Sequence, residues 1–151
     1  MKKSILIMFL LLCSMGFSQE TEKRYDETLA KSLQADEYGM KKYVFCLLKS
    51  GTNTTISKEE SKKLFEGHMA NINKLAKEGK LVVAGPFMKN ERNYRGIYIF
   101  NVETIDEAKA LVDTDPAIEA KLLEAELTPW YATAALQETV KIHEKIAKKK
   151  F

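Results

Sequence analysis

The chain has 151 residues, of which 45% are hydrophobic and 30% charged, and this composition fits one ordinary folded domain and excludes a disordered or collagen-like chain. Its 24 basic and 21 acidic residues give a formal net charge of +3. Lys2 and Lys3 belong to an N-terminal segment that we expect to be removed. The remaining balance of +1, with mixed charges, gives no electrostatic case for nucleic-acid binding, since proteins that bind nucleic acid concentrate Lys and Arg on one face.

Residues 1–18 are predicted to be a secretory signal peptide. Two lysines precede nine consecutive apolar residues, 5–13, and the small residues Gly16 and Ser18 follow where a signal peptidase needs them. Nine apolar residues are too few for a bilayer core that needs roughly 20. We therefore expect cleavage after Ser18, a periplasmic or secreted protein, and no stable membrane anchor.

The next segments are predicted to be a short arm and a strand. Residues 19–41 are charged with a weak helical stripe, which indicates an N-terminal helical arm. Residues 43–48 are apolar at odd and even positions alike, which is typical of a strand buried on both faces. Cys46 lies in this strand and is the only cysteine left after cleavage, so no internal disulfide is expected and its thiol is interpreted as a packing group.

A well-marked amphipathic helix follows. Ser57 and Glu60 have the spacing of a capping box, and Gly79 is a helix stop. His68 falls within one arc of about 140° on a helical projection, together with the apolar side chains. These are Leu64, Phe65, Met69, Ile72, Leu75 and Ala76.

Two strands come next, joined by a polar connection. Residues 81–84 are apolar, and Pro86 after them cannot donate a ladder hydrogen bond, so this strand is expected at a sheet edge. Residues 88–95 are polar and 96–102 are again rich in strand-forming side chains. The pair is predicted to be a long-looped hairpin.

A second helix is predicted to open at another capping box, Thr104 with Glu107. It breaks before Asp115 and Pro116, where a short helical turn begins with Pro at its first position. Aspartate directly before such a Pro is an ordinary N-cap.

The last elements complete the order strand, helix, strand, strand, helix, strand. Residues 123–127 alternate between apolar and polar, and Pro129 favours an edge position. Residues 134–151 are expected to form a C-terminal helix. The fold class is therefore α+β, ferredoxin-like (βαββαβ), with a four-stranded antiparallel sheet covered by helices on one face and short helical extensions at both ends.

Such a sheet needs a cover for its second face, because its first three strands are apolar on both faces. A second copy of the chain is the simplest cover and would give a homodimer with a closed β core, a dimeric α+β barrel. The terminal helices are the competing cover.

Several motifs resemble one known family at matching separations. They are His68, Gly79, residues 81–86, Gly96, residues 106–108, Asp115 with Pro116, and Pro129 with Trp130. In these residues the chain resembles the YCII-related (YciI-like) family over roughly residues 43–131, so 42–133 is taken as the domain. The resemblance implies ferredoxin-like protomers that dimerise through their sheets, with a catalytic His and Asp pair in a cleft. Here these are His68 and Asp115.

The chain departs from the family pattern at two places. Family members often carry an Arg shortly before the His, whereas this chain has Phe65, Glu66 and Gly67 there. Family members also often carry an aromatic residue after Asp-Pro, whereas this chain has Ala117. We therefore expect a pocket of different charge and size.

A His and Asp pair has simple chemistry. The carboxylate orients one ring nitrogen and stabilises the imidazolium, and the other nitrogen moves a proton near neutral pH. Two other interpretations stay open from the sequence: His68 as a packed core histidine bonded to a carbonyl, and Asp115 as an N-cap alone.

Three more residues are candidates for substrate binding. Tyr94 and Arg95 could supply a hydrogen bond and an anion contact, and Gly85 would let a ligand approach the backbone. Their alternative is a solvated hairpin tip. Four aromatic residues are predicted to line the cleft: Phe87, Tyr94, Tyr98 and Trp130.

The predicted function is an exported small-molecule enzyme of lyase or hydrolase type, acting on a small cyclic or aromatic substrate. No metal-binding, covalent-haem or phosphate-loop motif is present, so neither a metal nor a cofactor is expected. The alternative is a non-catalytic dimeric ligand-binding or accessory module in which His68 is structural.

Overall fold

The computed structural model describes residues 25–149, and the predicted signal peptide lies outside them. Export therefore stays a prediction. Helices and strands follow in the order α2 (Glu27–Ser32), β1 (Met40–Ser50), α3 (Lys58–Lys77), β2 (Leu81–Pro86), β3 (Tyr94–Phe100), α4 (Ile105–Val112), α5 (Pro116–Glu119), β4 (Leu123–Thr133), the 3₁₀ helix η1 (Ala134–Glu138) and α6 (Thr139–Ile146). None of the helices within 25–149 is long and apolar enough to cross a membrane.

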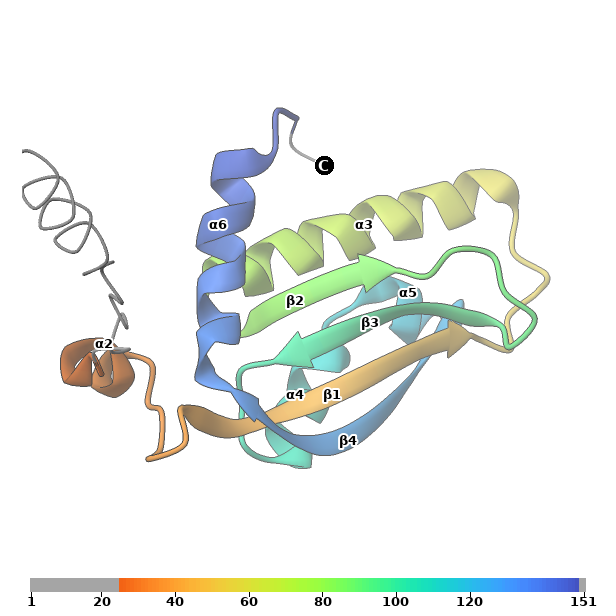
Figure 1. Ribbon diagram of the computed structural model, residues 1–151. Coiled ribbons are helices and arrows are strands. Elements are labelled where there is room, and N and C mark those ends of the chain that lie inside the picture. Colours follow the sequence, from red (N-terminus) through yellow and green to blue (C-terminus); the bar gives the residue numbers. More distant parts are fainter. Residues whose placement is uncertain (1–24, 150–151) are drawn as a thin grey trace, which may run out of the picture.

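The strands form one antiparallel sheet with the order β2-β3-β1-β4. This order confirms the predicted ferredoxin-like fold, with the first and third strands at the centre. Pro86 and Pro129 lie in the two edge strands, as their missing N–H groups require. Figure 1 shows α3 running along the sheet, with α4 and α5 packed behind the strands.

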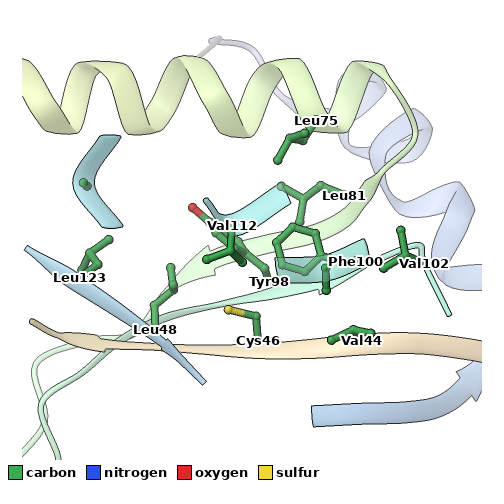
Figure 2. Packing of buried hydrophobic residues seen from close by; sticks show 12 residues of the cluster. Val44, Cys46, Leu48, Leu75, Leu81, Tyr98, Phe100, Val102, Val112 and Leu123 are labelled. Carbon is green, nitrogen blue, oxygen red and sulfur yellow. The ribbon is translucent and has the colours of Figure 1, made fainter. Parts of the chain in front are cut away.

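One face of the sheet carries the main core. Alternation along β1 turns Val44, Cys46 and Leu48 toward the helices, where each is almost fully buried. Tyr98 and Phe100 reach the same layer from β3. Figure 2 shows these side chains between the sheet and α3. The helix face is therefore a closed core built from all three central helices.

The opposite face of the sheet is covered only in part. Tyr43, Val82, Ile99 and Ala132 form a second buried cluster, against which Leu136 of η1 packs. The remainder of this face is an open hollow of about 580 Å³. It is lined by Phe45, Val83, Ile97, Ile99, Thr128, Trp130 and Leu136. The C-terminal extension thus covers one end of the face and forms one wall of the hollow.

The two terminal extensions are tied to each other and to the sheet. The Gln137 side-chain amide donates to the Leu33 carbonyl at 2.6 Å, and the Asn101 side chain donates to Gln137 at 3.3 Å. The Thr139 hydroxyl donates to the Val82 carbonyl at the β2 edge. Figure 1 shows α2 and α6 at the same end of the sheet. Residues 134–138 form a 3₁₀ turn that holds Ala134 and Leu136 against the sheet, and the C-terminal helix α6 follows it.

The chain connecting α5 to β4 contains a strained residue. Lys121 has φ of +57°, in the left-handed region that glycine tolerates best. Its carbonyl accepts the Asn53 backbone N–H at 3.0 Å, so this turn also anchors the loop after β1.

Lys121→Gly is expected to raise the free energy of unfolding by about 0.5–1 kcal/mol, since removing the strain outweighs the larger entropy of the unfolded chain. Urea unfolding measures the change. Lys63→Gly, within α3, is the matched control and should lower the free energy of unfolding by about 1 kcal/mol. A loss of stability in Lys121→Gly would contradict the strain.

Candidate functional site

The structure brings His68 and Asp115 into direct contact. His68 lies on the inner face of α3, and Asp115 directly precedes α5. Their Nδ1 and Oδ2 atoms are 2.7 Å apart, although 47 residues separate them in the chain. His68 is 9% exposed and Asp115 1% exposed, so the contact is shielded from water. A charge-assisted hydrogen bond in such surroundings is stronger than one at the surface.

The two oxygens of Asp115 have separate partners. Oδ1 accepts the Ala117 backbone N–H at 3.0 Å and so caps α5. Oδ2 accepts from His68 and also from the Tyr98 hydroxyl, which lies 3.3 Å away. Capping and contact with His68 therefore coexist, each on its own oxygen.

This arrangement favours one tautomer of the His68 ring. A buried carboxylate oxygen accepts hydrogen bonds, so Nδ1 carries the proton that points at Asp115. Nε2 of the neutral ring then holds the lone pair. The Tyr98 hydroxyl lies 3.3 Å from Nδ1 and 3.3 Å from Nε2, so it also contacts the nitrogen that holds the lone pair. Nε2 is the nitrogen available to move a proton.

Burial favours the protonated forms of the neighbouring Tyr98 hydroxyl and Cys46 thiol. Burial, and then the Asp115 carboxylate, raises the pKa of Tyr98 well above its ordinary value, so its hydroxyl stays protonated and acts as a donor. The same two causes raise the pKa of the Cys46 thiol to about 12. Cys46 is fully buried, and its protonated thiol serves as a packing group in the core.

Aromatic rings surround the histidine. The Phe65 ring meets it edge-on with centroids 5.7 Å apart, and the Tyr98 ring lies 6.0 Å away at an interplanar angle of 30°. Within residues 25–149, one surface hollow lies on the far face of the sheet and another along the start of α3, and neither of these includes His68 or Asp115 among its lining residues.

The three predicted substrate-binding residues lie together at one end of the β2–β3 hairpin. Gly85 pairs with Ile97 in the sheet, and Tyr94 and Arg95 begin β3. The Tyr94 ring packs on Phe87 with centroids 5.9 Å apart. Within the described chain, no hydrogen bond links these three residues to His68 or Asp115, and their binding role stays a prediction.

The expectation that Tyr98 and Trp130 line one cleft is wrong. Tyr98 pairs with Cys46 and points into the helix-face core, whereas Trp130 pairs with Tyr43 and lines the hollow on the opposite face. Successive residues of a strand alternate between faces, and the register decides which aromatic residues meet.

Sequence reasoning missed two contacts of the site. Tyr98 donates to Asp115, and the Asn71 side chain donates to the backbone carbonyl and hydroxyl of Thr114, at 2.9 and 2.7 Å. Asn71 lies three residues after His68 and thus on the same face of α3. This spacing in the sequence could have indicated that Asn71 lies beside His68 at the site. In residues 25–149 no three His, Cys, Asp or Glu side chains gather as a metal site.

A model of the YCII-related domain family matches residues 42–131, more than half of the chain. This chain belongs to the YCII-related domain family. The match confirms the resemblance inferred from the motifs. It spans His68, Asp115 and Tyr98 and ends before η1, so the C-terminal cover of this YCII-related domain lies outside the matched residues.

Among solved structures, the YCII-related domain is similar to the 5-chloro-2-hydroxyhydroquinone dehydrochlorinase of Burkholderia phenoliruptrix AC1100, determined in complex with 2,5-dihydroxybenzoquinone. The two chains are 19% identical with a TM-score of 0.44, and the alignment covers 58% of this chain and 92% of that chain. No curated protein matches the chain.

Replacing Asp115 separates its two roles. Asp115→Asn keeps an oxygen for the α5 cap but turns an amide NH₂ toward His68 and Tyr98, and we expect a loss of about 1 kcal/mol. Asp115→Ala also removes the cap and leaves buried donors without partners, which should cost about 2–4 kcal/mol. Urea unfolding measures both.

Asp113→Asn is the matched control, because Asp113 is exposed and its side chain pairs with Lys109 four residues earlier. It should change stability by less than about 0.5 kcal/mol. Equal losses in Asp115→Asn and Asp115→Ala would contradict the separate use of the two oxygens.

Proposed function

We propose that this protein is an exported small-molecule enzyme in which His68 is the general acid or base and Asp115 orients it. The observation that carries the proposal is the 2.7 Å contact between His68 Nδ1 and Asp115 Oδ2. A helix cap and a buried hydroxyl hold this carboxylate, so the ring needs no reorganisation before it acts.

The chemistry follows from Nε2, the ring nitrogen that does not face Asp115. Nε2 can take a proton from a substrate while Asp115 stabilises the imidazolium that forms. Such a pair suits proton abstraction, elimination or activation of water, which are reactions of lyase or hydrolase type. Phe65 and Tyr98 flank the ring with aromatic surface, which favours a small cyclic or aromatic substrate.

A second candidate function is a non-catalytic ligand-binding or accessory module. It is favoured by the 9% exposure of His68 and by the absence of this residue from both described hollows. In that case the pair is a structural brace that holds α5 on α3.

A thermal-shift screen of small phenols, quinones and lactones distinguishes the two functions. At 100 times its Kd, a ligand stabilises a protein by about 2.7 kcal/mol, which for a chain of this size raises Tm by about 5–10 °C. The enzyme proposal predicts compounds that stabilise the wild type and His143→Gln, an exposed control, but not His68→Gln.

Those compounds are then tested for turnover by absorbance. His68→Gln should convert them at least about 100-fold more slowly than the wild type. The enzyme proposal fails if every stabilising compound acts equally on His68→Gln, or if none is converted.

We also propose that two copies associate through the open part of the far face. Phe45, Ile97 and Trp130 supply apolar surface there, and the C-terminal extension leaves it uncovered. Contiguous exposed apolar surface on a sheet is typical of an interface. Thr128 lies exposed within the same lining, so a charge there would be solvated in a monomer and buried in a dimer.

Thr128→Glu is therefore expected to convert a micromolar dimer into a folded monomer, because burying an unpaired carboxylate is costly. Light scattering after size exclusion gives the mass. Asn73→Glu, an exposed change on α3 behind the sheet, should remain dimeric. A wild-type monomer at this concentration would overturn the association.

A further inference from the structure

The residues next to the His68–Asp115 contact also touch. A β-carbon added at Gly67 would lie 2.7 Å from Cγ of Pro116, and 3.7 Å from its Cβ. Real β-carbons do not approach other atoms as closely as the first distance, so the backbone of α3 rests directly on the proline ring. Gly67 precedes His68 and Pro116 follows Asp115, which places this contact one residue from the 2.7 Å hydrogen bond.

Glycine is otherwise a poor choice for this position. It lies in the middle of α3, where glycine is less favourable than any residue except proline. No positive φ requires it there. The close approach of Pro116 is the feature that only glycine permits.

The contact is rigidly connected to the carboxylate. Pro116 is the first residue of α5, and its ring fixes its own φ. Asp115 Oδ1 is bonded to the next backbone N–H of the same turn. A displacement of the proline ring therefore moves the carboxylate with it.

A second tie lies one helical turn further along α3. Asn71, four residues after Gly67, binds the Thr114 carbonyl and hydroxyl. Three consecutive residues, 114–116, thus dock on three positions of one face of α3: Asn71, His68 and Gly67, respectively.

We propose that Gly67 and Asn71 are positioning residues that set the distance between His68 and Asp115. The role rests on the proposed function, since the distance matters for catalysis only if the pair is catalytic. Gly67 permits the close approach of α5 to α3, and Asn71 fixes where α5 lies along that helix. Neither needs to touch substrate.

The test is the protonation of the His68 ring, read from long-range ¹⁵N–¹H spectra of histidine-labelled full chain. Gly67→Ala should lose the Nδ1-protonated signature of His68, because the new methyl group pushes Pro116 and Asp115 away. The double variant Gly67→Ala/Pro116→Ala should regain it, because no Cγ remains at the contact.

Asn71→Ala tests the second tie in a variant that keeps the core intact, and it should reduce the Nδ1-protonated fraction. Asn73→Ala, on the exposed side of the same helix, should leave it unchanged. If Gly67→Ala does not fold but the double variant Gly67→Ala/Pro116→Ala folds and shows His68 protonated at Nδ1, the contact is also supported.

The proposal would be overturned if Gly67→Ala and Asn71→Ala both gave the same His68 spectrum as the wild type. It would also be overturned if the double variant Gly67→Ala/Pro116→Ala failed to regain the Nδ1-protonated signature. This readout uses no substrate. It can therefore succeed when the thermal-shift screen fails, and a failure of positioning is distinguishable from a failure of the proposed enzyme.

Discussion

The candidate site depends on the carboxylate of Asp115. Four residues are far too few for a helix that is stable in isolation, so α5 exists because this side chain caps it and because its first turn docks on α3. The same side chain, through its other oxygen, orients His68 and accepts from Tyr98. Local helix capping and the chemistry of the site are thus supported by one buried group, and a change that disturbs one disturbs the other.

Much of the fold could be predicted from the sequence because its signals are local. Thr104 and Glu107 form the predicted capping box, and Ser57 accepts the Glu60 N–H at the start of α3. The edge positions of Pro86 and Pro129 follow from a missing donor. The family motifs allowed His68 and Asp115 to be named together, although periodicity alone could not show that they meet.

What could not be predicted depends on register and on contacts between distant segments. Tyr98 joins Asp115 because its pairing with Cys46 turns it toward the helices, while Trp130, also aromatic and in a strand, faces the other way. The role of Gly67 is visible only when Pro116 is placed beside it. Of the two competing covers of the second sheet face, the C-terminal extension covers one end through η1, and an open apolar hollow is left at the other end.

The central claim is that Asp115 holds His68 as the Nδ1-protonated tautomer, with the lone pair on Nε2. The most direct measurement is the long-range ¹⁵N–¹H spectrum of the wild-type protein at a pH where the rings are neutral, with exposed His143 as an internal reference. The account predicts one protonated Nδ1 for His68 and an averaged, solvent-like spectrum for His143. A His68 protonated at Nε2, or averaged like His143, would contradict it.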